Sequence, residues 1–301
     1  MTGRYDTPAA FKQALKARVK QRAKTAGRGF NQMLQVVLFE RFLARVYEAL
    51  GDSVILKGGF ALELRLARAR TTRDVDLRID GDIEKHLDEL RRVAGRQGQD
   101  YLRFDLGDPV DFEEMLGEQV VYEGRRLKVR TLLAGQSFGH PFRLDVSVGD
   151  RLVLPPDIVP GTDLFEFVGL VPVNHRLYPP AAHLAEKLHA LTTVYEAGPN
   201  SRSRDLVDIG LLAKSTSFDA DSLRRSIEAT FQFRDTHSIP ESLPTPPEFW
   251  HRLYANMRDT NELPWPDLDA LQQFCTQFFD PLLDGTVADN HAWSPEEQSW
   301  Q

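Results

Sequence analysis

The chain has 301 residues, 42% of them hydrophobic and 27% charged, and its formal net charge is -7 at pH 7. This length and apolar fraction allow a substantial hydrophobic core and favour two lobes. The single cysteine, Cys275, excludes an internal disulfide and a cysteine-rich zinc site. No signal peptide is recognisable and no apolar run is long enough to span a membrane, so we expect a cytoplasmic protein without a membrane partner.

The first 28 residues are strongly basic, with Asp6 as their only acidic side chain. Their lysines and arginines are Arg4, Lys12, Lys16, Arg18, Lys20, Arg22, Lys24 and Arg28. A basic arm or helix of this kind commonly binds phosphate backbones. It can equally be a solvated helix face that keeps the protein soluble, and the sequence leaves both interpretations open.

Two stretches have the apolar spacing of helices that cover a sheet. Residues 31–50 place leucine, valine and phenylalanine near helical intervals and end at Gly51-Asp52. Residues 82–95 are amphipathic, with charged residues on one side and apolar residues on the other. We expect both helices to pack on the core and to carry no chemistry of their own.

Between these helices lies a sharp glycine turn. The β-branched run Val54–Leu56 stops at Lys57-Gly58-Gly59, and helical spacing resumes over Phe60–Leu66. Paired glycines after a strand let the backbone turn and bring its N–H groups close to a ligand. The N-terminus of the following helix stabilises anions. The pattern therefore predicts a turn that binds phosphate.

The next strand, Asp74–Ile79, carries two carboxylates on one face. Its strict alternation directs Asp74 and Asp76 to the same side and the intervening apolar residues into a core. Carboxylate oxygens suit Mg²⁺, which proteins often hold with one or two carboxylates plus substrate phosphates. Together with the glycine turn, this strand would hold a nucleoside triphosphate and its metal. The alternative is an exposed strand face that happens to be acidic.

The middle of the chain is rich in predicted strands, at residues 120–122, 126–132, 142–148 and 167–171. Within 142–148, Asp145 shares its face with Arg143 and Ser147, opposite an apolar set. Asp145 is our third candidate carboxylate, and Asp150, at the end of this strand, is a less favoured one. Asp145 could instead be a surface carboxylate paired with Arg143.

From Pro179-Pro180 onward the pattern changes to helices. Residues 181–197 form a leucine stripe with Lys187 on its flank, and spacing alone predicts that this lysine extends to water. Asp205 and Asp208 then lie three apart near the start of another helix, where Asp205 can act as a cap. Further helices are predicted at 219–230, 249–257 and 268–283, and the polar residues after Gly285 are expected to be mobile.

Three groups of residues resemble motifs of the polymerase-β-like nucleotidyltransferases, and specifically of the AbiEii family, the toxins of type IV toxin–antitoxin pairs. They are Lys57-Gly58-Gly59 with Thr72-Arg73-Asp74-Val75-Asp76-Leu77, then Glu186-Lys187-Leu188-His189-Ala190-Leu191, and finally Arg204-Asp205-Leu206-Val207-Asp208-Ile209. One departure is Phe60, which stands where many polymerase-β-like enzymes have a serine or threonine that touches a terminal phosphate.

The resemblance implies an α/β (α+β) fold and a set of site residues. We expect a nucleotidyltransferase domain over 1–175 with a mixed β-sheet and a basic N-terminal helix, a helical domain over 176–285, and a mobile tail over 286–301. The implied catalytic residues are Asp74, Asp76, Lys187 and Asp208, with Asp74, Asp76 and Asp145 binding Mg²⁺. The implied nucleotide-binding residues are Lys57, Gly58, Gly59, Arg73, Arg204 and Asp205.

Individual roles follow from the same resemblance. Lys187 would reach the nucleotide phosphates and offset charge on the transferring group. Asp208 would act either as a base or as the partner that positions Lys187, whereas helix capping explains Asp205 equally well.

The implied function is a Mg²⁺-dependent toxin that transfers a nucleoside monophosphate from a nucleoside triphosphate to the 3′ acceptor end of transfer RNA. This would arrest translation until a cognate antitoxin protein neutralises it. Two alternatives remain open at this point: a related enzyme that modifies a protein or a small molecule, and a non-catalytic nucleic-acid-binding module that uses the basic segment.

Overall fold

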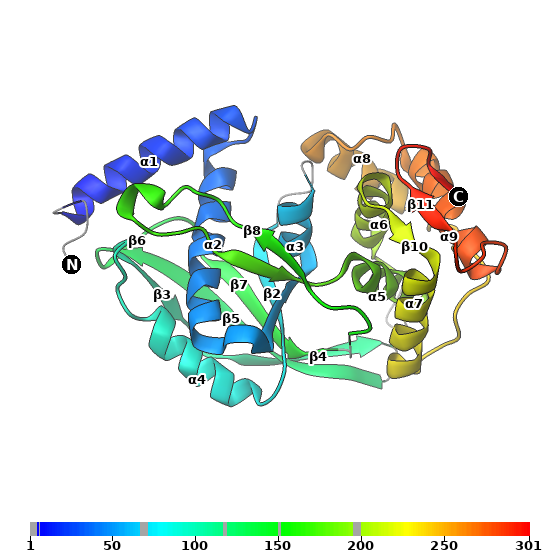
Figure 1. The fold of residues 1–301 in the computed structure, drawn as a ribbon, viewed down its shortest axis with the longest axis horizontal. Coiled ribbons are helices and arrows are strands. Elements are labelled where there is room, and N and C mark those ends of the chain that lie inside the picture. Colours follow the sequence, from blue (N-terminus) through cyan, green and yellow to red (C-terminus); the bar gives the residue numbers. More distant parts are fainter. Residues whose placement is uncertain (1–4, 6, 67–71, 117–118, 150–151, 195–199) are drawn as a thin grey trace.

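The structure is a computed structural model that describes residues 5, 7–66, 72–116, 119–149, 152–194 and 200–301. Figure 1 shows a lobe built on a β-sheet beside a lobe of helices. This mixed α/β architecture confirms the expected fold class. None of the helices in the described ranges is both long enough and apolar enough to cross a bilayer.

A mixed sheet of nine strands, counted over the described residues, forms the first lobe. Its central order is β3-β5-β7-β2-β1-β9-β8, with β4 and β6 also paired to β5. The strands are β1 (Val54–Lys57), β2 (Asp74–Ile79), β3 (Leu102–Leu106), β4 (Val110–Leu116), β5 (Gln119–Leu133), β6 (Gln136–Ser137), β7 (Phe142–Val148), β8 (Asp157–Pro160) and β9 (Asn174–Leu177). Pairing is parallel between β2 and β7 and between β1 and β9.

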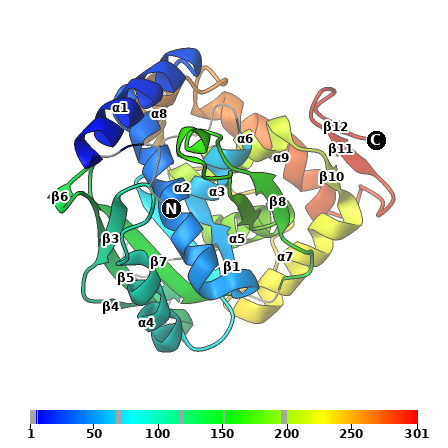
Figure 2. The ribbon, with the colours of Figure 1, turned by 60° about the vertical axis from the view of Figure 1, so that its left-hand side comes forward.

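Two helices cover one face of this sheet, as Figure 2 shows for α2 (Phe30–Leu50) and α4 (Ile83–Ala94). Both were predicted from their apolar spacing. The alternate positions Val75 and Leu77 of β2 are buried against them, in a core that also contains Phe42. Burial of one strand face in this way leaves the opposite face for polar residues.

The basic N-terminal segment forms α1 (Pro8–Thr25), which packs against α2. Phe11, Leu15 and Val19 of α1 are fully buried. The segment is therefore a docked helix with a basic outer face, and not a free arm.

A short helix, α3 (Gly58–Arg65), joins the two lobes. Its Phe60 and Ala61 belong to the core of the sheet lobe, whereas Leu62 packs into the core of the helical lobe. The glycine turn at the start of α3 consequently lies where the lobes meet.

The second lobe contains α5 (Pro180–Thr192), α6 (Ser203–Ser215), α7 (Ala220–Arg234), α8 (Trp250–Asn261) and α9 (Leu268–Leu283). The predicted helix over 181–197 thus ends earlier, at Thr192, and residues 195–199 lie outside the described residues. The predicted strand over 167–171 is wrong, because the 3₁₀ helix η2 (Glu166–Val168) occupies its start. A second 3₁₀ helix, η1 (Gly51–Ser53), precedes β1.

The prediction of a mobile tail over 286–301 is also wrong. Residues beyond Gly285 form β11 (Ala292–Ser294) and β12 (Ser299–Trp300), which extend from β10 (Phe218–Asp219) as a three-stranded sheet. Trp293 is fully buried, and its indole Nε1 donates a hydrogen bond to the carbonyl oxygen of Ala213 at 2.6 Å. Polar composition misled the prediction because the buried Trp293 and the half-buried Trp300 anchor the segment despite its many polar residues.

Candidate active site

Four charged residues form a row across the polar face of the sheet. The strand register places Lys57 of β1 beside Asp76 of β2, Asp76 beside Asp145 of β7, and Asp145 beside Arg126 of β5. Paired residues on neighbouring strands have side chains on the same face. Asp74 lies two residues before Asp76 and therefore shares this face. The structure thus brings the three predicted carboxylates together.

Two arginines hold the outer carboxylates of this cluster. Arg126 binds Asp145 through two hydrogen bonds of 2.8 and 2.7 Å, and Arg143 binds Asp74 through two of 2.7 and 2.5 Å. These hydrogen bonds raise the pKa of both guanidinium groups. The sequence suggested Arg143 as the partner of Asp145, but β5 provides that partner because its antiparallel register places Arg126 opposite.

The carboxylate of Asp76, which lies between Asp74 and Asp145, accepts no hydrogen bond and forms no ion pair within the described part of the chain. Burial raises the pKa of Asp76 to about 6, Asp145 adds to the rise, and Lys57 opposes it. A half-buried carboxylate beside a second carboxylate is stabilised by a cation. Its oxygen donors, with those of Asp145, fit a hard divalent ion.

The described residues contain no ready-made group of three or more His, Cys, Asp or Glu side chains that could hold a metal ion. The arginine pairs explain this, since Asp74 and Asp145 point their oxygens at guanidinium groups. A site that uses all three carboxylates therefore requires the arginines to release them.

The glycine turn lies directly against Asp76. Gly58 has φ +67°, and a Cβ built on it would lie 1.9 Å from Oδ2 of Asp76. Its N–H donates to Nε2 of His183 on α5 at 3.1 Å, so this N–H is not the free phosphate donor that the turn suggested. Gly59 and Phe60, in the first turn of α3, have N–H groups without intrahelical acceptors.

His183 was missed by the sequence analysis. Burial, with a smaller contribution from the charge of Lys187, lowers its pKa to about 3, which keeps the imidazole neutral and able to accept the Gly58 N–H. A signal was present, because His183 precedes Lys187 by four residues and therefore lies on the same side of a helix.

We predict that Gly58→Ala lowers the rate of nucleotidyl transfer by about 100-fold, because the new methyl group must displace the Asp76 carboxylate. Gly169→Ala is the matched control, since Gly169 also has positive φ, +78°, but open space at its Cβ position. Equal losses of rate in the two purified variants would show that backbone strain, and not contact with Asp76, is responsible.

Lys57 is buried at the same junction. Its Nζ lies 3.7 Å from Oε1 of Glu186 on α5, and Nη2 of Arg234 lies 3.7 Å from the same oxygen. Tyr178 donates a hydrogen bond to it at 2.8 Å. Burial opposes ionisation of Glu186, but Lys57 and Arg234 outweigh it and lower the pKa to about 2. This network fixes the end of β1 against the helical lobe.

Lys187 does not extend to water, contrary to the prediction from its spacing. Its side chain is 12% exposed, and its Nζ donates hydrogen bonds of 2.8 Å to Oδ1 of Asp205 and to Oδ2 of Asp208. Burial disfavours the ammonium group, but the two carboxylates outweigh this effect and raise its pKa. Its charge also lowers the pKa of Asp76, so it acts on the carboxylate cluster across the junction.

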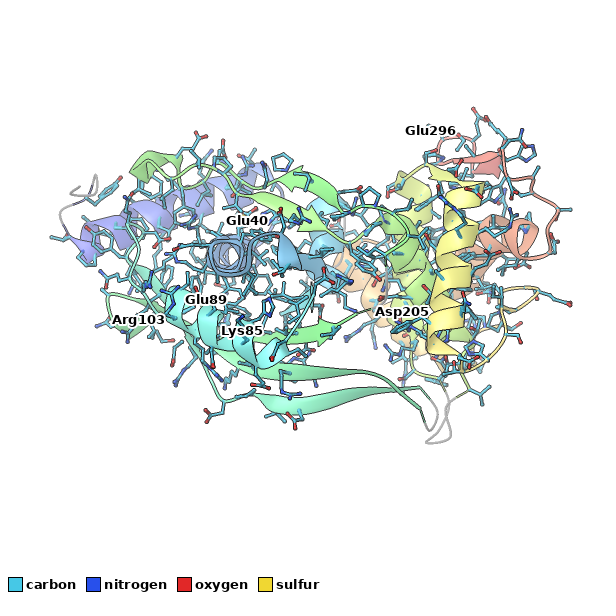
Figure 3. The ribbon with its side chains drawn as sticks, turned by 60° about the horizontal axis from the view of Figure 1, so that its bottom comes forward. Glu40, Lys85, Glu89, Arg103, Asp205 and Glu296 are labelled. Atoms are coloured by element: carbon cyan, nitrogen blue, oxygen red, sulfur yellow. The ribbon has the colours of Figure 1, made fainter. Side chains whose placement is uncertain are left out.

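Asp205 is not a helix cap, because α6 has no side-chain cap at its N-terminus. Figure 3 shows Asp205 on the side of the helical lobe that faces the sheet lobe. Asp208 is 2% exposed and thus held deep behind Lys187. Both carboxylates support the lysine in this arrangement.

The remaining predicted residues are less constrained. Arg73 and Arg204 are exposed.

Comparison with known proteins identifies relatives. The family described as "Nucleotidyl transferase AbiEii toxin, Type IV TA system" matches residues 41–278. No curated protein sequence matches significantly. Among solved structures, the MenT4 nucleotidyltransferase toxin of Mycobacterium tuberculosis has a TM-score of 0.56 and 17% identity, over 94% of this chain and 92% of that one. JHP933 from Helicobacter pylori has a TM-score of 0.42 and 16% identity, over 84% and 94%.

Proposed function

Because the chain belongs to the AbiEii family of nucleotidyltransferase toxins of type IV toxin–antitoxin systems, we propose that it transfers a nucleoside monophosphate to the 3′ acceptor end of transfer RNA. The observation that carries the proposal is the half-buried Asp76 between Asp145 and Lys57, whose carboxylate has no partner among the described residues, with Lys187 across the lobe junction. This combination suits a nucleoside triphosphate and a divalent cation.

Asp76, with Asp145 and Asp74, would hold Mg²⁺ in this proposal. When bound, the ion neutralises phosphate charge and favours loss of the leaving group. Lys187, fixed by Asp205 and Asp208, offsets charge on the phosphates as a compact cation. The position of Asp208 behind Lys187 favours a positioning role for it over that of a base.

The N–H groups of Gly59 and Phe60 are proposed to bind phosphate oxygens at the start of α3. The Phe60 side chain cannot take part, since its ring lies 4.9 Å from that of Phe39 in the core. The hydroxyl contact made in many polymerase-β-like enzymes is thus replaced by backbone donors alone. Arg73 and Arg204, both exposed, are proposed to contact the nucleotide or the acceptor.

The reaction itself needs positioning and charge neutralisation. The acceptor hydroxyl attacks the α-phosphate in line, a new P–O bond forms, and pyrophosphate leaves as the α–β bond breaks. Asp145 is proposed to take the proton of the acceptor hydroxyl once Arg126 has released the Asp145 carboxylate. Such a modification of the acceptor end would block aminoacylation and arrest translation in the cytoplasm, until a cognate antitoxin protein neutralises the enzyme.

The acceptor can be identified directly. Purified protein is incubated with Mg²⁺, total RNA and each labelled nucleoside triphosphate in turn, and the products are separated by size. We expect label on transfer RNA, removable by nucleases that trim 3′ ends. Label on protein or on a small molecule alone would contradict the transfer RNA proposal while leaving the enzyme class intact.

A further inference from the structure

Helix α1 carries a row of lysines on its outer face. The helix contains no acidic residue, and Lys12, Lys16, Lys20 and Lys24 recur at intervals of four. Consecutive members are about 6 Å apart along the helix axis. Over the described ranges, none of the four forms an ion pair. The arginines of α1 differ, since Arg18 stacks on the ring of Phe167 at 4.0 Å and Arg22 lies 3.8 Å from Asp163.

The first two lysines of this row line a cavity of about 310 Å³. It lies between α1, the start of α2 and the hairpin that contains β6, and no carboxylate contributes to its lining. Asn31, Gln35 and His140 provide further polar groups. Lys12 is held at the cavity by the ring of Phe138, 5.7 Å from its Nζ. The lining is therefore rich in donors and cations.

Gln35 adds an independent observation. Its Nε2 is buried and has no hydrogen-bond partner among the described residues. A buried donor of this kind costs free energy unless an acceptor reaches it. An anion in the cavity would provide that acceptor and would be attracted by both lysines.

We propose that the cavity and the lysine row bind the phosphate backbone of a polynucleotide acceptor, away from its reacting end. The inference rests on the proposed function for the identity of the acceptor. Like charges four apart on a helix repel one another, and here they are concentrated in a protein whose net charge is -7. A polyanion relieves this repulsion by contacting several lysines at once.

The surface is connected to the catalytic strand. Arg28, in the turn after α1, donates from Nη1 to Oε1 of Glu63 at 2.8 Å, and the other oxygen of Glu63 accepts the N–H of Thr72 at 3.4 Å. Thr72 precedes Asp74 by two residues. A strand of RNA on α1 could therefore continue toward the carboxylate cluster along one side of the sheet lobe, where Figure 1 shows α1 crossing the end of α2.

The test measures binding of fluorescently labelled transfer RNA by anisotropy, without nucleotide, over a series of salt concentrations. We expect Lys12→Gln/Lys16→Gln to raise Kd at least about tenfold and to reduce the slope of log K against log salt by about 1.4 to 1.8. The KM for RNA in transfer should rise by a similar factor. Lys85→Gln/Lys214→Gln is the matched control, because both lysines are exposed on other helices. Its Kd for transfer RNA should stay within about twofold of that of the unaltered protein.

Gln35→Met separates binding from folding. Removing an unpartnered buried amide should leave the melting temperature unchanged or higher, whereas RNA affinity should fall. Unchanged affinity in both Gln35→Met and Lys12→Gln/Lys16→Gln would overturn the inference. So would lysine-dependent binding to vesicles rich in phosphatidylglycerol without binding to RNA, which would indicate a membrane surface.

The outcomes for this surface and for the proposed function are distinguishable. If RNA binding depends on Lys12 and Lys16 but no label reaches RNA, the catalytic proposal fails and the binding surface remains. If label reaches transfer RNA but the lysine variants bind and react normally, the binding surface is wrong and the catalytic proposal remains.

Discussion

Replacing Asp76 with asparagine is expected to reduce nucleotidyl transfer by at least about 1000-fold, because the carboxylate at the centre of the cluster no longer contributes to cation binding. The same change should stabilise the metal-free protein at neutral pH. The half-buried, ionised carboxylate lies next to Asp145 and lacks an ion pair among the described residues, so its removal relieves an unfavourable charge.

The raised pKa of Asp76 determines whether stability rises or falls with pH. The folded protein raises the pKa of Asp76 from 3.8 to about 6 and thus binds this proton more tightly than the unfolded chain does. Protonated Asp76 contributes to stability in full below its pKa in the unfolded chain, and this contribution is lost as pH rises through its pKa in the folded protein. Above the folded-state pKa, ionised Asp76 lowers the free energy of unfolding by at most about 3 kcal/mol.

Denaturant unfolding of Asp76→Asn and of the unaltered protein, without metal, measures this effect. The difference in free energy of unfolding in favour of the variant should grow between about pH 4 and about pH 6 and level off at higher pH. Asp80→Asn is the control, since Asp80 is exposed and pairs with Arg78. Normal transfer by Asp76→Asn, or lower stability at every pH, would contradict the proposed role.

Lys187→Met is expected to lower the free energy of unfolding by about 3–5 kcal/mol, because it leaves the buried Asp208 and the half-buried Asp205 without their cation. Transfer should fall as well, since the charge proposed to offset that of the phosphates is lost. Thermal and denaturant unfolding give the first quantity, and single-turnover kinetics below the new melting temperature give the second.

A triple variant separates the two roles of the lysine. In Lys187→Met/Asp205→Asn/Asp208→Asn neither carboxylate is left without the lysine, so most of the stability should return while transfer stays low. Lys214→Met, an exposed lysine on the same helix as the two carboxylates, controls for loss of charge. Recovery of transfer in the triple variant would show that Lys187 serves only the fold.

The strand that carries Asp74 and Asp76 was predictable because local pattern and tertiary placement agree there. Strict alternation in Asp74–Ile79 requires one apolar and one polar face, and the sheet buries the apolar one. The helix at 268–283 was likewise predicted with its observed bounds, since its aromatic residues recur on one side. Polymerase-β-like motifs then indicated that Asp145 and Lys187 belong with this strand.

What the sequence could not provide was the identity of partners on distant strands and helices. Arg126 meets Asp145 only because β5 pairs antiparallel with β7 in one particular register. Lys187 looked like a surface residue because its carboxylate partners come from the following helix. Alternation of Arg126, Lys128 and Arg130 on one face of β5 was a signal for a basic strand, but it does not specify which carboxylate is bound.

The buried Trp293 has a consequence for biosynthesis. It lies in the core of the helical lobe with Phe274 and Phe278, yet the ribosome adds it long after α5 and α6. Because domains fold as cooperative units during synthesis, the lobe that carries Lys187 cannot complete its packing until elongation has passed this tryptophan. A nascent toxin would thus remain inactive while most of its own message is being read.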